Sequence, residues 1–296
     1  MTAEPKVLRY AAFTDDPAGG NPAGIVLDAS ALDHAAMQAI ATEVDYSETA
    51  FVTGRDGDLR TVRYFSPISE VPFCGHATIA TAVAIAEREG PGIVRFATPV
   101  GEISIETRDD GNGLRAAFTS PDTDLAHFPE FALDALLELI GVDRVHLDER
   151  YPPRIATAGG RHPVIVIADA DVFDGFRFDP GAMRAFIDAQ GWPLTIAVLH
   201  RVSDAADGAL HFEARNIFPV GRITEDPATG SAAGPLALHL ARHGRIEFGD
   251  EIEISQGVEI GRPSTLYARV DGSADQVERV EVGGSAVIVS RGELKL

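Results

Sequence analysis

The sequence is poor in several residue types that define common protein classes. It has one cysteine, Cys74, among 296 residues. A single cysteine excludes an internal disulfide and a metal site made of several thiolates. Basic residues are also scarce, since 25 Lys and Arg face 45 Asp and Glu, for a formal net charge of −20. A surface this negative repels nucleic acid and anionic lipid, so neither is expected as a partner.

Long apolar runs are missing too. No stretch approaches the roughly 20 apolar residues that a membrane span requires, and no apolar run follows a basic N-terminal segment. With 45% hydrophobic and 24% charged residues, the composition is typical of a globular chain. We therefore expect a cytoplasmic protein without a membrane partner.

Two stretches share one arrangement, in which a proline precedes a glycine corner and an apolar helix. One is P-F-C-G-H-A-T at residues 72–78, and the other is I-T-E-D-P-A-T-G-S-A-A-G-P-L at residues 223–236. In the second, Ser231 is a good N-cap, and Pro235 is expected in the first helical turn, where a missing N–H is harmless. The start of a buried helix offers free N–H groups to an anion. Both corners are therefore candidate sites for a small anionic substrate.

The segments around these corners also repeat in order. A strand, a proline turn, a strand, a helix, two strands, a Phe-Pro segment and the corner occur twice. The proline turns are expected at residues 20–22 and 159–163, and the closing strands at 251–255, 265–270, 277–282 and 286–290. Such a repeat predicts two similar domains, with a boundary within residues 120–130. An apolar helix among short strands predicts a sheet wrapped around that helix, with the substrate between the halves.

Several motifs carry a family resemblance. Asn21-Pro22-Ala23-Gly24, Ser47-Glu48-Thr49, the segment at residues 73–78, the segment at 225–234 and Val282-Gly283-Gly284-Ser285-Ala286 resemble, in this order, the signatures of the PhzF (phenazine biosynthesis) family. The resemblance implies the α+β, diaminopimelate-epimerase-like fold. In that fold two pseudo-symmetric domains each wrap a mostly antiparallel, barrel-like sheet around a buried helix, and the active site lies in the cleft between them.

Applied to this chain, the resemblance implies domains at residues 1–122 and 123–284, with the last strand, 285–296, often returning to the first domain. The family's characterised member isomerises a dihydro-hydroxyanthranilate without metal or cofactor. We therefore expect a cofactor-independent isomerase that moves a proton between carbons of a small carboxylated, cyclic or conjugated metabolite. The resemblance also suggests a homodimer, and it leaves the substrate's identity open.

The Ser-Glu-Thr match makes Glu48 the expected acid/base. Moving a proton between carbons needs one group that can take and return it. Composition alone favours reading Glu48 as an exposed turn residue, and only the resemblance reverses this in favour of catalysis. Its neighbours Glu43 and Asp45 are read as solvated.

His76 and Asp226 complete the expected catalytic set. His76 stands at a helix start, where it can hold a substrate carboxylate or pass a proton, although a histidine there can also be a simple cap. Asp226 can bind a substrate hydroxyl or amine, yet Asp-Pro is also an ordinary turn initiator. The expected substrate-binding residues are Gly75, Thr229, Gly230 and Ser231, which supply backbone and hydroxyl donors.

Counting also limits the alternatives. Related epimerases use two opposed thiols, and this chain has one cysteine, so Cys74 is read as a small buried apolar residue. An epimerase or racemase that uses carboxylate and histidine stays possible, as does a binding protein that has lost turnover. His239 and His243 have the spacing of a zinc pair but lack the glutamate of that motif, so no metal is expected.

Overall fold

The computed structural model describes residues 6–111, 113–120, 123–158, 160–192, 195–202, 210–219 and 223–293. The chain divides into two compact units. The first comprises Met1–Thr119 together with Gly283–Leu296, and the second is Ser120–Val282. The domain boundary expected between residues 122 and 123 adjoins residues 121 and 122, which lie outside the described residues.

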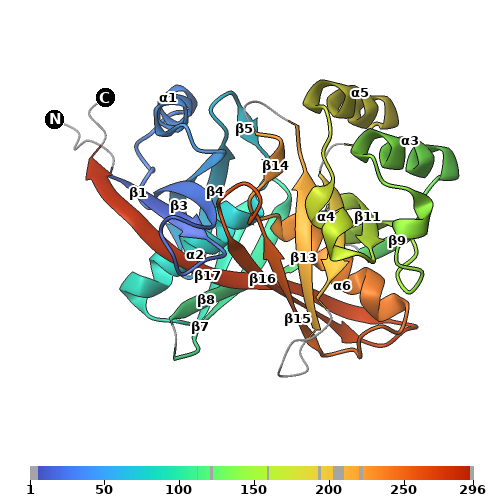
Figure 1. Ribbon diagram of the computed structural model, residues 1–296. Coiled ribbons are helices and arrows are strands. Elements are labelled where there is room, and N and C mark those ends of the chain that lie inside the picture. The colour runs from blue at the N-terminus through green and yellow to red at the C-terminus, as the bar shows by residue number, and fades with distance from the viewer. Residues whose placement is uncertain are drawn as a thin grey trace. The chain divides into compact units, whose positions relative to one another are not determined.

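The first unit is a sheet that surrounds one buried helix (Figure 1). Helix α2 packs against strands β1, β2, β3 and β7, and every residue from His76 to Ala86 is buried. A helix that is apolar on all sides forms the core rather than covering it. The elements of this unit, in chain order, are β1 (Lys6–Ala12), β2 (Asn21–Val26), α1 (His34–Val44), β3 (Glu48–Asp56), β4 (Leu59–Phe65), β5 (Glu70–Val71), α2 (Gly75–Glu89), β6 (Ile93–Thr98), β7 (Gly101–Asp109) and β8 (Leu114–Ser120).

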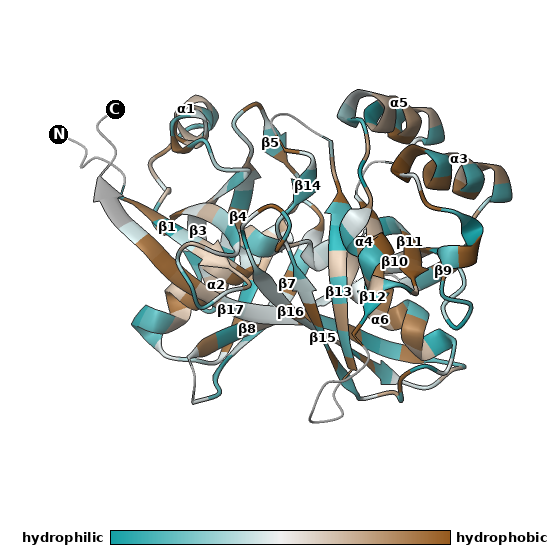
Figure 2. Cartoon of the chain, viewed as in Figure 1, coloured by the Kyte–Doolittle hydropathy of each residue, from teal (hydrophilic) through white to brown (hydrophobic). Residues whose placement is uncertain are grey.

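The second unit is built in the same way around α6. This helix packs against β9, β10, β11 and β16, and Figure 2 shows brown, hydrophobic segments on α6 and on α3. The elements of this unit are β9 (Thr123–His127), α3 (Glu130–Ile140), a short 3₁₀ helix (Arg144–His146), β10 (Arg154–Ala158), β11 (Arg161–Ile167), α4 (Ala170–Gly175), α5 (Pro180–Gln190), β12 (Ile196–Arg201), β13 (Leu210–Ile217), β14 (Glu225–Asp226), α6 (Gly230–Arg242), β15 (Glu251–Gln256) and β16 (Ser264–Gly272). The last strand, β17 (Val277–Glu293), begins in this unit and belongs to the first unit from Gly283 onward.

The two units follow one pairing plan. In the first, β1 pairs antiparallel with β2, β2 parallel with β3, β3 antiparallel with β4, and β4 antiparallel with β5 and parallel with β6. In the second, β10, β11, β12, β13, β14 and β15 pair in the same order and directions. The repeat seen in the sequence is therefore a repeat of topology.

An ion pair fixes which residues correspond. On β4, Arg63 binds Glu70 of β5 through two bonds of 2.7 Å. On β13, Arg215 binds Glu225 of β14 at 3.1 and 2.6 Å. In both units a proline and then a glycine follow the glutamate strand, so the corner of residues 72–76 matches that of residues 227–231.

Three local expectations were wrong. Pro22 and Pro163 lie in strands β2 and β11 rather than in turns, because proline's fixed φ suits an extended chain near a strand start. The N-cap of α6 is Thr229, not Ser231, so Pro235 lies inside the helix and removes the usual donor to the Ser231 carbonyl. The closing strands expected at 277–282 and 286–290 form one strand, β17, which crosses Gly283.

Helix length bears on the membrane question. Among the described residues, none of the helices has both the length and the apolar character needed to cross a bilayer.

Candidate active site

Glu48 is the first residue of β3, where the chain leaves α1. Helix α1 ends at Asp45, whose left-handed backbone turns the chain toward the sheet. Glu48 pairs with Ala23 of β2 in parallel register. Its side chain is 22% exposed, so the carboxylate is held by the protein yet reachable from solvent.

The start of α2 brings two side chains to this carboxylate. His76 Nε2 lies 3.4 Å from Glu48 Oε2 and 3.3 Å from Ser47 Oγ. Burial lowers the pKa of His76, while the nearby charge of Glu48 acts in the opposite direction. His76 is thus favoured as a neutral imidazole, which can donate one hydrogen bond and accept another. The expected grouping of Glu48 with His76 is present in the structure.

Cys74 also lies at this carboxylate. Its Sγ is 3.5 Å from Glu48 Oε2, and 3.3 and 3.7 Å from the two ring nitrogens of His76. An atom in the ring plane and nearly equidistant from both nitrogens would overlap Cε1, so the sulfur lies over the face of the ring. These two sulfur–nitrogen contacts are therefore not directed hydrogen bonds.

The same geometry tests the three groups as metal ligands. Their donor atoms all lie within 4.8 Å of one another. A metal ion on an imidazole nitrogen lies in the ring plane, so a thiolate on that ion is much nearer to one nitrogen than to the other. The Cys74 sulfur is instead almost equally far from the two nitrogens. The ring of His76 would therefore have to turn before the three donors could share an ion.

In the second unit, Asp226 lies in a network at the start of α6. Thr229 Oγ1 donates to Asp226 Oδ2 at 2.6 Å. Gln256, at the end of β15, donates to the Asp226 carbonyl at 2.7 Å and to Thr229 Oγ1 at 3.0 Å. Gln256 Oε1 accepts from the Thr229 backbone N–H at 3.2 Å. The carboxylate of Asp226 is thereby fixed beside the first turn of α6.

Ser231, the second residue of α6, is held by a different residue. Its Oγ lies 3.2 Å from Nε2 of His162, which is fully buried on β11. His162 Nδ1 lies 3.0 Å from both the carbonyl and the hydroxyl oxygen of Thr195. Thr195 Oγ1 in turn donates to Asn216 at 3.2 Å. Four polar side chains thus form one chain beneath the helix start.

The pairing registers show which of these residues have counterparts. Thr49 pairs with Phe65, and Ile196 with Ile217. Phe65 and Ile217 each follow the arginine of the shared ion pair by two residues. The preceding residues, Glu48 and Thr195, therefore correspond, so the second unit has threonine where the first has the carboxylate.

Asp226 is unique to its unit in the same way. Tyr64 pairs with Val71, and Asn216 with Asp226. Since Tyr64 and Asn216 both follow the ion-pair arginine directly, Val71 is the counterpart of Asp226. Each unit thus carries one carboxylate that the other lacks.

Sequence reasoning missed His162 and Gln256. His162 stands in a stretch interpreted as a turn, and its partners are 33 and 69 residues away. Gln256 precedes Gly257, whose positive φ of 78° and closeness to Pro227 leave no room for a side chain. The Gln256-Gly257 pair at the end of a strand was the one feature of the sequence that could have indicated the contacts of Gln256 with Asp226 and Thr229.

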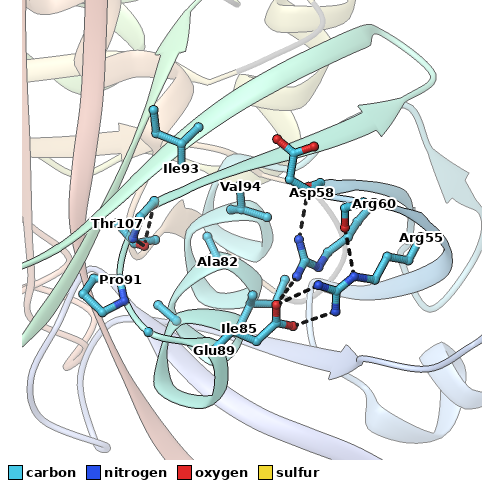
Figure 3. A pocket seen from close by; sticks show the side chains of 14 residues that line it. Arg55, Asp58, Arg60, Ala82, Ile85, Glu89, Pro91, Ile93, Val94 and Thr107 are labelled. Carbon is cyan, nitrogen blue, oxygen red and sulfur yellow. Dashed lines mark hydrogen bonds and ion pairs between the residues drawn. The ribbon is translucent and has the colours of Figure 1, made fainter.

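A cavity of about 320 Å³ lies at the opposite end of α2 (Figure 3). Figure 3 shows the Glu89 carboxylate between the guanidinium groups of Arg55 and Arg60. The formal charges that line the cavity cancel, because it is lined by two arginines and by the two carboxylates of Glu89 and Asp58. On α2 the lining runs from Ala82 to Glu89, so the two arginines and Glu89 gather about 20 Å along the helix from His76. The cavity is not part of the Glu48 group.

The chain has relatives that match over nearly its whole length. It is 37% identical to the trans-2,3-dihydro-3-hydroxyanthranilate isomerase of Pseudomonas fluorescens, over 96% of this chain and 97% of that protein. It is 32% identical to an uncharacterized isomerase of Deinococcus radiodurans, over 97% and 94% of the two chains. These relatives support an isomerase.

Solved structures agree on the fold. A PhzF-family phenazine biosynthesis protein of Bacillus anthracis superposes with a TM-score of 0.86 at 25% identity, over 100% of both chains. A predicted epimerase of Pseudomonas aeruginosa superposes with a TM-score of 0.80 at 27% identity, over 99% of both chains. The expected α+β, epimerase-like fold is confirmed. The model of the PhzC-PhzF family, described as phenazine biosynthesis-like protein, matches residues 10–292, and the chain belongs to this family.

Proposed function

We propose that this protein is a cofactor-independent isomerase that moves a proton between two carbons of a small carboxylated ring compound, with Glu48 as the acid/base. Glu48 breaks a C–H bond by taking the proton, a π bond shifts, and the same carboxyl returns the proton to another carbon. Substrate and product thus have the same atoms, and no oxidant or reductant is needed.

One observation carries the proposal: the position of Glu48 is occupied by Thr195 in the second unit. Inverting a carbon centre between two bases needs a proton-transfer group on each face. Threonine does not serve as a base near neutral pH. The two units therefore do not offer matched bases at this position, and Asp226, the carboxylate of the second unit, stands at a different position where Thr229 donates to it. This arrangement fits an isomerase that takes and returns the proton on one face better than it fits an epimerase with two matched bases.

The substrate class is inferred from the relatives. The Pseudomonas fluorescens relative is named for trans-2,3-dihydro-3-hydroxyanthranilate, a ring that carries a carboxylate, an amine and a hydroxyl. The first turns of α2 and α6 both offer N–H groups to a carboxylate. We propose a substrate of this class: a cyclic acid with at least one hydroxyl or amine.

His76 and Asp226 are proposed to orient this substrate. His76 is favoured as the neutral form, so it can donate a hydrogen bond to a substrate oxygen without placing a second charge beside Glu48. Asp226 is fixed by Thr229 and Gln256, and it can accept from a substrate hydroxyl or amine.

The test is solvent deuterium incorporation into trans-2,3-dihydro-3-hydroxyanthranilate. General acid–base catalysis contributes roughly 10²–10⁴-fold, so Glu48→Gln should lose about that factor while it still binds the substrate. Glu43→Gln, on the exposed surface of α1, is the matched control and should exchange normally. Asp226→Asn should weaken kcat/KM by roughly tenfold, the effect of one lost charged hydrogen bond.

Three results would overturn the proposal. Full exchange in Glu48→Gln would remove the carboxylate from the reaction. A product with an inverted centre, detected by chiral chromatography, would indicate an epimerase instead. Tight binding without exchange or conversion in the wild-type protein would indicate a binding protein.

A further inference from the structure

His162 is a buried histidine that the proposed proton transfer does not use. It lies on β11, which packs against α6, and it is 0% exposed. Its counterpart in the first unit is Ala23. Ala23 pairs with Glu48, and His162 lies two residues before the Val164–Ala197 pair, beside Thr195. The second unit thus places an imidazole where the first has only a methyl group.

The partners of His162 determine where its proton lies. The Thr195 carbonyl, 3.0 Å from Nδ1, can only accept, so Nδ1 carries the hydrogen. The Thr195 hydroxyl, also 3.0 Å from Nδ1, can share that hydrogen because its own proton is donated to Asn216 Oδ1. Burial lowers the pKa of His162 to about 4, so the ring is neutral near pH 7 and its Nε2 is an acceptor.

This assignment fixes the hydroxyl of Ser231. With Nε2 as an acceptor at 3.2 Å, the Ser231 proton points inward to His162. The protons then run in one direction along the chain, from Ser231 to His162, from His162 to Thr195 and from Thr195 to Asn216. Ser231 is half-buried as a residue, and its oxygen is left with lone pairs to offer.

We propose that His162 is a positioning residue that keeps the Ser231 hydroxyl proton inward, so that Ser231 accepts a hydrogen bond from a hydroxyl or amine of the substrate. This revises the expectation that Ser231 donates to the substrate. The start of α6 then has two separate functions. Its backbone N–H groups bind an anionic group of the substrate, and the Ser231 oxygen accepts a hydrogen bond from a substrate hydroxyl or amine. This proposal rests on the proposed function for the substrate class alone.

A serine beside a histidine can also be a nucleophile. In the catalytic triads of hydrolases, a carboxylate orients the histidine and stabilises the imidazolium that forms. Here the orienting group is the neutral carbonyl of Thr195, and a buried imidazole with a low pKa is a weak base. The geometry therefore favours an oriented acceptor over an activated nucleophile.

The first arm of the test needs no substrate. In protein labelled with ¹⁵N-histidine, the ring nitrogen shifts of His162 should show the Nδ1–H tautomer, unchanged between pH 8 and pH 6. An Nε2–H tautomer or an imidazolium in this range would overturn the proposal, whatever the protein catalyses. A clear Nδ1–H signal in a protein without isomerase activity would leave this arm intact and refute the proposed function alone.

The second arm uses a matched pair of variants. In His162→Gln, the longer amide can reach the place of Nε2 and still accept from Ser231. In His162→Asn, the shorter amide reaches the place of Nδ1, keeps Thr195 and leaves Ser231 without an acceptor. We expect His162→Asn to raise KM for trans-2,3-dihydro-3-hydroxyanthranilate about tenfold at nearly unchanged kcat, the effect of one hydrogen bond. His162→Gln should stay within about threefold of wild type.

Controls separate positioning from folding. Ser231→Ala should reproduce the KM of His162→Asn, and the double variant should show no further increase, because both remove the same contact. Equal losses in the Gln and Asn variants would indicate a merely structural histidine and overturn the proposal. Covalent labelling of Ser231 by a fluorophosphonate in the wild-type protein would overturn it in favour of a nucleophile.

Discussion

The start of α2 and the start of α6 share a backbone plan but place histidine and serine differently. At α2, the histidine is the second residue of the helix, His76, and the serine, Ser47, precedes β3. At α6, the serine is the second residue of the helix, Ser231, and the histidine comes from β11. The contact between the two residue types is kept, while the residue that the helix presents is exchanged.

The difference shows how a duplicated scaffold can divide its work. Both corners keep the residues that set the backbone conformation, namely the arginine–glutamate pair, the proline and the glycine. The groups that can exchange or bind protons have diverged. The position of Glu48 in the first unit is Thr195 in the second, and the position of Asp226 in the second unit is Val71 in the first. Topology is therefore constrained by packing, and the chemistry is set by a few positions at the helix starts.

The largest expected difference concerns the shared ion pair. Arg215 and Glu225 are 3% and 7% exposed, and the Arg215 guanidinium also stacks on Phe176. Glu225→Ala leaves a buried, unpaired charge and should reduce the free energy of unfolding by about 3–5 kcal/mol. Glu70→Ala breaks the half-buried pair with Arg63 and should reduce it by about 1 kcal/mol or less.

Urea denaturation of the two variants measures this difference. Equal losses of stability would mean that burial does not distinguish the two pairs.

The second expected difference is in acid stability. His239 of α6 is 0% exposed, neither of its ring nitrogens has a hydrogen-bond partner among the described residues, and burial lowers its pKa to about 3. The unfolded chain binds a proton near pH 6.5, but the folded chain does not. Stability is therefore fully present above pH 6.5 and falls as the pH drops toward 3, by about 2 kcal/mol at pH 5.

His239→Leu should remove about 2 kcal/mol of this dependence between pH 7 and pH 5, as measured by urea unfolding at both values, while His162, whose pKa burial also lowers, keeps the rest. His127→Gln, at an exposed histidine of β9, is the control and should keep the wild-type slope. An unchanged slope in His239→Leu would show that this histidine does not cause the acid sensitivity.

The smallest effects should be equal in the two units. Asp33 caps α1 by accepting from the Ala36 N–H at 2.8 Å, and Asp179 caps α5 by accepting from the Ala182 N–H at 2.8 Å. Each change to alanine should reduce stability by about 1 kcal/mol. Thermal unfolding of both variants checks this, and a clear inequality would show that the two caps do not contribute equally.

Local pattern was enough to predict much of the fold. The closing strands expected at 251–255 and 265–270 lie within β15 and β16, because alternating side chains bounded by turn residues identify a strand. The two apolar helices were found because they are buried on all sides. Glu48 and His76 were singled out by motif, and the structure brings them together.

What failed depends on contacts between distant residues. Gly283 was read as a break, yet it lies within β17. A glycine is needed at this point of the strand because a Cβ would meet the Ala116 carbonyl oxygen at 2.7 Å. His162 and Gln256 were missed because their partners are fixed by strand pairing, which no local pattern reports. The cap of α6 was misplaced by two residues, because Ser231 and Thr229 are both good cap residues in sequence terms.

Strand β17 has a consequence for how the chain folds. It supplies the antiparallel partner of β1 from residues 286–293, whereas the second unit is continuous from Ser120 to Val282. The second unit can therefore fold from one continuous segment, but the first needs two segments that lie far apart in the sequence. Until β17 joins the sheet, β1 keeps an open edge that can pair with other chains, so a chain truncated at Val282 would expose an unfinished sheet in its first unit.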